Sequence, residues 1–250
     1  MKLKKITDFL DETLNIKEID DYSLNGLQVE NSGEVSKAGF AVDASLASFQ
    51  KAAEKNADLL VVHHGLFWQK PESVTGSNYQ RFKILFEADI ALYAAHLPLD
   101  LHDRLGNNAR VQKVLEWKVS EDFGEYKGIE IGKKVSFDAP VSLKQLEKEI
   151  SEKLHCKPLV WNFGKKKIKN AGYVSGGAVD LLEQAIDQGL DLFITGEPKH
   201  SFYWTAKEAR INVIFAGHYA TETLGVKAVS ELLEKKFDVE CFFIDLPTGL

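Results

Sequence analysis

Cysteine is nearly absent from this 250-residue chain, in which Cys156 and Cys241 are the only two. They lie far apart and form no C-x-x-C pair, so the sequence predicts neither a disulfide framework nor a thiolate zinc site. Isolated cysteines of this kind behave as small buried side chains in a reducing compartment, which indicates a cytoplasmic protein.

Long apolar runs are also missing, since no stretch of 18 uninterrupted apolar residues occurs and a membrane-spanning helix is not predicted. The opening segment "MKLKKITDFLDETL" (1–14) meets acidic residues early and reads as an amphipathic helix, not a signal peptide. The net charge of -6 argues against non-specific nucleic-acid binding, which depends on cationic side chains. With 44% hydrophobic residues, however, the chain can fill one large core or two ordinary ones.

An internal duplication organises the sequence. Residues 38–65 align with residues 171–198 at a constant offset of 133 without a gap. Each copy shows a β-rich run, an amphipathic helix and a buried apolar run, the order of a βαβ unit with parallel strands and a right-handed crossover. A second match joins "IALYAAHLPLD" (90–100) to "NVIFAGHYATE" (212–222).

These matches predict an α/β fold of two similar halves, residues 1–126 and 127–250, with segment 223–250 packing back on the first half. The glycine-rich and charged segment 121–134 between them is expected to be a linker or an edge strand. Ligands of open α/β sheets bind beyond the carboxyl ends of parallel strands. We therefore expect the functional site in the cleft between the halves.

Metal-capable side chains gather at the predicted strand ends: His63, His64, His96, Asp100, Glu197, His218 and Glu222. Adjacent residues within a strand point to opposite faces, so His63 and His64 are expected just past the strand end, where Gly65 permits a sharp turn. They could then reach two ions about 3.5–4 Å apart. Nitrogen and carboxylate ligands without thiolates suit iron, manganese, zinc, cobalt or nickel, among which the sequence does not choose.

The spacing around the later ligands gives two local predictions. His218 and Glu222 are four residues apart before a helical pattern, so they share a helix face if the first turn is helical. His96 and Asp100 have the same spacing but enclose Pro98, which favours an extended loop there.

Seven segments together carry a family resemblance: "NGLQVE" (25–30), "VVHHGLFW" (61–68), "HLPLDLHDRLGNNA" (96–109), "SGGA" (175–178), "FITGE" (193–197), "AGHYATE" (216–222) and "FIDLP" (243–247). In this order they resemble the dinuclear-metal toroid family of GTP cyclohydrolase 1 type 2 homologues, in its short form without an inserted domain. The resemblance covers essentially the whole chain.

That resemblance implies two divalent metal ions per chain. His64 and Asp100 would bind one ion, His63 and His218 the other, and Glu222 would bridge both. It also implies a ring-shaped homohexamer, a trimer of dimers. The exposed-looking aromatics of the segment after the histidines (Phe67, Trp68 and Tyr79) would cover the cleft or a subunit contact.

Two functions follow as hypotheses. The first is a metal-dependent hydrolase that opens the purine ring of GTP and releases formate, with a small-molecule substrate of the nucleotide class. His96 and Glu197 are then the candidate catalytic residues. The alternative is a non-catalytic metal-binding or interaction protein, which stores, delivers or regulates metal or acts structurally in an oligomer. Neither hypothesis involves a membrane or a nucleic acid.

Overall fold

The computed structural model describes all 250 residues, which divide into two compact units. Unit 1 comprises Met1–Leu105 and Gly225–Leu246, and unit 2 comprises Gly106–Leu224 and Pro247–Leu250. The expected boundary between residues 126 and 127 falls in the turn of a hairpin that belongs to unit 2. No helix combines the length and the apolar composition that crossing a membrane requires.

Unit 1 is built on a five-stranded sheet in the order β1-β4-β3-β2-β11. Strands β2, β3, β4 and β11 run parallel to one another, and β1 pairs antiparallel with β4 at one edge. Its elements are α1 (Leu3–Thr13), β1 (Gly26–Val29), β2 (Lys37–Asp43), α2 (Leu46–Glu54), β3 (Leu59–His64), α3 (Gly76–Glu87), β4 (Ala91–Ala94), α4 (Leu97–Leu101), most of α9 (His218–Lys236) and β11 (Glu240–Phe243).

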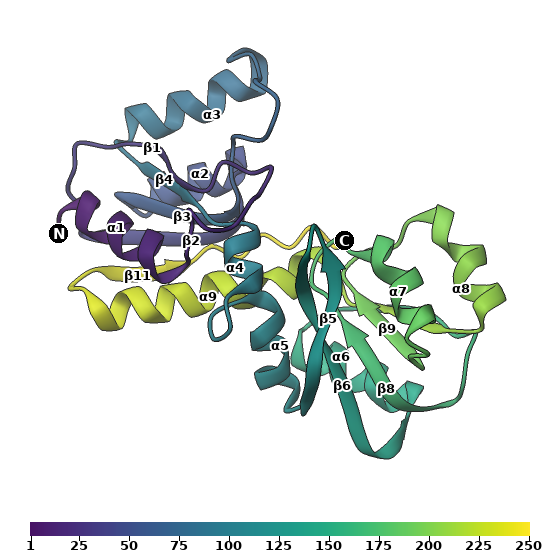
Figure 1. The fold of residues 1–250 in the computed structure, drawn as a ribbon. Coiled ribbons are helices and arrows are strands. Elements are labelled where there is room, and N and C mark those ends of the chain that lie inside the picture. The colour runs from purple at the N-terminus through teal and green to yellow at the C-terminus, as the bar shows by residue number, and fades with distance from the viewer. The chain divides into compact units, whose positions relative to one another are not determined.

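Both faces of the unit 1 sheet are covered, which explains why the first four residues of β3 are all apolar and buried. In Figure 1, α2 and α3 lie on one face, and α1 and α9 lie on the other. Phe49 and Ala52 of α2 pack with Leu60 and Val62 of β3 in one buried cluster. Helix α2 begins at the N-cap Ser45, whose side chain accepts a bond from the backbone of Ser48 in a reciprocal capping box.

Unit 2 holds a six-stranded sheet in the order β5-β6-β8-β9-β10-β7. Strands β8, β9 and β10 are parallel, and the remaining pairings are antiparallel. Its elements are α5 (Asn107–Leu115), β5 (Val119–Tyr126), β6 (Ile129–Ser142), α6 (Leu143–Lys153), β7 (Leu159–Trp161), β8 (Lys167–Tyr173), η1 (Val179–Leu181), α7 (Leu182–Asp187), β9 (Leu192–Thr195), η2 (His200–Phe202), α8 (Tyr203–Ala209), β10 (Asn212–Phe215) and the first residues of α9.

The unit 2 sheet also separates two buried clusters. Leu192 and Ile194 of β9 pack with α5 and α6, whereas Phe193 between them packs with α7 and α8. This is the alternation of side chains expected along a strand. Of the two alternatives for segment 121–134, the edge strand is confirmed and the linker is not, because the segment forms most of the β5–β6 hairpin at the edge of this sheet.

The two units repeat the same strand register, which supports the duplication. Ala38 of β2 pairs with Leu59 of β3, and Ala171 of β8 pairs with Leu192 of β9, each shifted by 133 residues. A carboxylate recurs at the same offset. Asp58 accepts the backbone N–H groups of residues 36 and 37, and Asp191 accepts those of residues 169 and 170. The α/β fold of two similar halves is therefore confirmed.

Candidate metal centre

His63 and His64 are the last two residues of β3, not the first two beyond it as the sequence had indicated. His63 is fully buried, and His64 is partly exposed. Their rings nevertheless lie together, with centroids 4.7 Å apart and planes inclined by 44°. The alternation of side chains along a strand thus does not keep two long rings apart at its end.

The glycine that follows the histidine pair serves close packing and not a sharp turn. Gly65 does not have a positive φ. A Cβ atom built on it would lie 2.4 Å from the Gln28 amide and 2.6 Å from the Cβ of Ala94. Gln28 also accepts a bond from the backbone N–H of Leu66 at 2.7 Å. Gly65 therefore lets β1 and β4 approach the carboxyl end of β3.

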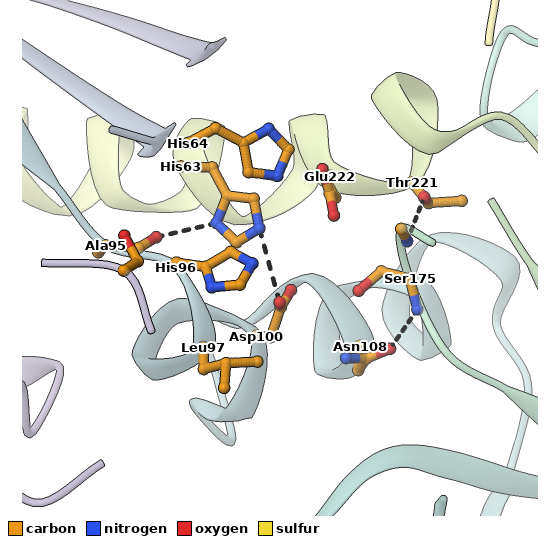
Figure 2. Close-up of polar contacts among 12 residues, drawn as sticks. His63, His64, Ala95, His96, Leu97, Asp100, Asn108, Ser175, Thr221 and Glu222 are labelled. Carbon is orange, nitrogen blue, oxygen red and sulfur yellow. Dashed lines mark hydrogen bonds and ion pairs between the residues drawn. The ribbon is translucent and has the colours of Figure 1, made fainter. Parts of the chain in front are cut away.

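Each histidine of the pair is oriented through its Nδ1 atom. His63 Nδ1 lies 2.8 Å from the backbone oxygen of Ala95, and His64 Nδ1 lies 2.8 Å from the Asp43 carboxylate. Both partners are pure acceptors, so a neutral ring carries its proton on Nδ1 and its lone pair on Nε2. Asp100 Oδ2 lies 3.5 Å from His63 Nε2 (Figure 2).

Asp100 comes from a helix and not from an extended loop, so the prediction made from Pro98 is wrong. Helix α4 begins at Leu97, directly after His96, and Pro98 occupies its first turn. Proline is tolerated there because the first N–H groups of a helix have no intrahelical acceptor. The Asp100 N–H bonds to the His96 oxygen at 3.1 Å, which fixes the carboxylate one turn beyond the imidazole.

His96 is 8% exposed, and a buried carboxylate holds it in place. Asp21 accepts from His96 Nδ1 at 3.0 Å, from the backbone N–H groups of Ser23 and Leu97, and from the side-chain amide of Asn25. Burial alone would raise the pKa of Asp21, but these bonds, led by that from His96, lower it to about 2.

Two aromatic side chains border His96 on the same side of unit 1. The Tyr22 ring lies 5.5 Å from the His96 ring, and the Trp68 ring lies 5.2 Å from it. An isolated bridge between Ser23 and Trp68 joins the two loops that carry these aromatics. Trp68 is therefore built into the histidine cluster, whereas Tyr79 is 50% exposed.

Unit 2 gathers one imidazole and two carboxylates. Helix α9 begins at His218, earlier than the helical pattern of the sequence indicates, so the turn that holds both residues is helical. Glu222 lies one turn after His218, with its Oε2 atom 3.1 Å from His218 Nε2. Glu197, which follows β9, lies 3.2 Å from His218 Nδ1. Burial lowers the pKa of His218, but Glu222 and Glu197 outweigh it and raise the pKa to about 9.

A glycine makes room for the Glu222 carboxylate. Gly176 has φ +67, and a Cβ atom on it would lie 2.2 Å from Glu222 Oε1. Its backbone N–H bonds to the Thr221 hydroxyl at 3.0 Å, and the neighbouring Ser175 N–H bonds to Asn108 at 2.8 Å (Figure 2).

The structure thus brings the predicted residues together in two groups: His63, His64, His96 and Asp100 in unit 1, and Glu197, His218 and Glu222 in unit 2. Sequence reasoning missed Asp21 and Asp43. Asp43 could have been found, because it ends β2 directly opposite His64. Asp21 lies in an irregular loop with no pattern that marks it.

The donor chemistry of unit 1 fits a transition-metal ion. One ring nitrogen from each of His63, His64 and His96 lies within 4.8 Å of the others. Metal-binding histidines are generally oriented by an oxygen acceptor on the second ring nitrogen, and all three have one. Imidazole and carboxylate donors suit zinc, iron, cobalt, nickel or manganese.

Comparison with known proteins assigns the class of protein. Residues 1–248 match the family described as Duf34/NIF3 (NGG1p interacting factor 3). The chain is 45% identical, over the full length of both proteins, to a GTP cyclohydrolase 1 type 2 homolog of Archaeoglobus fulgidus. The chain belongs to the Duf34/NIF3 family.

Solved structures agree with that assignment. The protein ybgI, described as of unknown function, matches with a TM-score of 0.94 and 34% identity over all of both chains. TTHA1606 from Thermus thermophilus matches with a TM-score of 0.90 and 41% identity, again over all of both chains.

Proposed function

We propose that this protein is a metal-dependent hydrolase that acts on a nucleotide, with two divalent ions per chain. The observation that carries the proposal is the common orientation of His63, His64 and His96, each held through Nδ1 by an oxygen acceptor. A histidine that only fills a core does not need its second nitrogen aimed at other imidazoles. Imidazoles fixed in this way are suited to ligate metal.

The proposed ligands follow the family resemblance. His64 and Asp100 bind one ion, His63 and His218 bind the other, and Glu222 bridges the two. Bound together, such ions supply Lewis acidity that makes water a nucleophile near neutral pH. The names of the relatives point to GTP as substrate, and the reaction would be hydrolytic opening of the purine ring with release of formate.

The two remaining candidate residues, His96 and Glu197, then take part in proton transfer. His96 has its Nδ1–H engaged by Asp21, so its Nε2 atom is available to exchange a proton with the substrate. Glu197 bonds to His218 Nδ1 and keeps its Nε2 atom directed toward the Glu222 side. In this proposal His96 touches the substrate, while Glu197 acts through His218.

The test is a formate-release assay on GTP with the metal-free protein and with zinc, manganese, iron, cobalt and nickel added singly. The proposal expects formate only with metal, and it fails if two ions bind but no nucleotide is turned over. Metal analysis of Glu222→Ala tests the bridging role. Both ions should bind more weakly, since a negative charge between two cations is removed. Retention of two tightly bound ions would contradict the ligand assignment.

The second candidate is a non-catalytic metal-binding protein. The observation that favours it is the donor set itself, because the three clustered imidazoles of unit 1 can hold a metal ion without any substrate being turned over. A protein that binds two ions tightly, releases no formate and keeps its ions without open coordination positions would support this candidate.

We also propose that the chain assembles as a homohexamer, a trimer of dimers. Its support is the exposure of large apolar side chains on and beside α3, with Tyr79 50% exposed and Phe86 67% exposed. Light scattering should give six times the 28.0 kDa mass of one chain. A monomer at micromolar concentration would rule the hexamer out.

A further inference from the structure

The three imidazoles of unit 1 form a cluster that involves no residue of unit 2. His63 and His64 end β3, and His96 follows β4, the neighbouring strand of the same sheet. The His96 ring lies 5.1 Å from the His63 ring and 5.7 Å from the His64 ring. One nitrogen of each ring lies within 4.8 Å of the other two.

All three rings use the same nitrogen to bond to the protein. Their Nδ1 atoms meet the Ala95 oxygen, the Asp43 carboxylate and the Asp21 carboxylate, at 2.8, 2.8 and 3.0 Å. None of these oxygens can donate a hydrogen, so a neutral ring must place its lone pair on Nε2 in every case. The three rings, at the carboxyl ends of two neighbouring strands, therefore share one neutral tautomer, with the lone pair on Nε2.

His96 is held by more hydrogen bonds than packing of its ring requires. Asp21 has only 1% of its side chain exposed and accepts four separate hydrogen-bond donors around the His96 ring. Asn25 in turn accepts the backbone N–H of His96 at 2.7 Å. Burying a carboxylate is unfavourable unless it is bonded in this way. The arrangement immobilises one imidazole, as an outer partner does for a metal ligand.

We propose that His63, His64 and His96 form a loading site, which takes the first divalent ion using residues of unit 1 alone. Three imidazoles with an open fourth position are an established ligand set for zinc, and cobalt and nickel accept it as well. The site differs from the five-ligand arrangement proposed above, because His96 replaces every ligand from unit 2. It shares His63 and His64 with that proposal but requires neither hydrolysis nor a second ion.

The test uses Co²⁺ alone as the probe, with a full-length chain in which both proposed unit 2 ligands are replaced, His218→Ala with Glu222→Ala. The loading site predicts that this variant still binds one Co²⁺ per chain, with absorption bands typical of nitrogen ligands. Adding His96→Asn should weaken that binding by at least about tenfold. The asparagine amide can keep the bond to Asp21, but it has no donor where Nε2 stood.

His155→Asn on the same background is the matched control, since it removes an exposed imidazole of unit 2 from a residue with φ +52, which asparagine tolerates. It should leave Co²⁺ binding unchanged. Equal affinity with and without His96→Asn would overturn the proposal, and so would the absence of Co²⁺ from the double variant.

X-ray absorption on the double variant with one equivalent of Co²⁺ gives an answer that does not require the His96 variant to fold. Three imidazoles around the ion are expected, and one or two would refute the loading site. The result is separable from the proposed function. Two ions retained by Glu222→Ala would contradict the bridging assignment, and a lack of formate release would contradict the hydrolase. Neither outcome changes the imidazole count.

Discussion

Units 1 and 2 share a strand register but differ in the side chains at the carboxyl ends of the equivalent strands β3 and β9. At the offset of 133, His63 and His64 correspond to Gly196 and Glu197. Unit 1 therefore presents imidazoles where its central strand ends, and unit 2 presents a carboxylate. In unit 2 the single imidazole, His218, comes from the next segment along and lies between Glu197 and Glu222.

Backbone packing explains why unit 2 cannot carry a histidine at that point. A Cβ atom on Gly196 would lie 2.6 Å from the oxygen of Gly176 and 2.6 Å from the Cα of His218. Backbone atoms cannot rotate away as a side chain can. The two units thus keep the same scaffold, but each carries its donor side chains where its own backbone leaves room for them.

The largest effect is expected at Gly196. Gly196→Ala should lower the free energy of unfolding by about 3 kcal/mol, because the added methyl overlaps backbone atoms. Gly39→Ala in unit 1 is the control. Its Cβ would meet only side-chain carbons, at 3.2 Å, and should cost less than about 1 kcal/mol. Urea unfolding measures both, and equal losses would remove the explanation given for the absence of a histidine.

The paired carboxylates should show the next largest effect. Asp191 is 7% exposed, accepts two backbone N–H groups and pairs with Lys165 at 2.7 Å. Asp191→Ala should destabilise the chain by about 2–3 kcal/mol, and Asp58→Ala, at the more exposed equivalent position, by about 1–2 kcal/mol. Thermal unfolding of the two variants tests the ranking. If Asp58→Ala destabilised the chain more than Asp191→Ala, burial of the carboxylate would not determine the size of the destabilisation.

The outer carboxylates should affect metal binding more modestly. Asp43 orients His64, and Glu197 orients His218. Asp43→Ala and Glu197→Ala should each weaken one ion by about 10- to 100-fold and leave the other ion bound. Competition with a coloured chelator measures the affinities, with the exposed Glu183→Ala as control. Loss of both ions from either variant would contradict the assignment of His64 and His218 to different ions.

The smallest effect is a pH dependence confined to unit 2. The pKa of His218 in the folded chain is about 9, above its ordinary value of 6.5, so protonated His218 stabilises the fold below pH 6.5 and that stabilisation disappears as the pH rises through 9. Solvent screening should hold the part of this stabilisation that Glu197 contributes under about 1 kcal/mol, since the Glu197 side chain is 36% exposed. Melting temperatures of metal-free protein from pH 6 to 10 should fall, and Glu197→Gln should flatten the curve. A rise with pH would contradict the assignment.

Much of this could be predicted from sequence because it depends on periodicity. Alternating and continuous apolar runs locate the strands, and the 133-residue offset identifies their repeat. The parts that could not be predicted depend on close contacts. The helical turn at Pro98 is a local exception, missed because proline fits the first turn of a helix as well as an extended loop. The close approach at Gly65 and the bond from His96 to Asp21 join segments that are distant in sequence. A single sequence does not record which loops meet.

Trp68 gives unit 1 an optical signal of its own. It is the only tryptophan of that unit, because Trp117, Trp161 and Trp204 all belong to unit 2. Its ring lies 5.2 Å from the His96 ring and 6.2 Å from the His64 ring, and its Nε1–H donates to the Gly65 oxygen at 3.1 Å. A paramagnetic ion on these imidazoles would quench its emission at such short range. Adding Ni²⁺ should therefore lower the tryptophan fluorescence of the unaltered chain and leave that of Trp68→Phe unchanged. The loss of fluorescence would then report the binding of metal to unit 1 in real time.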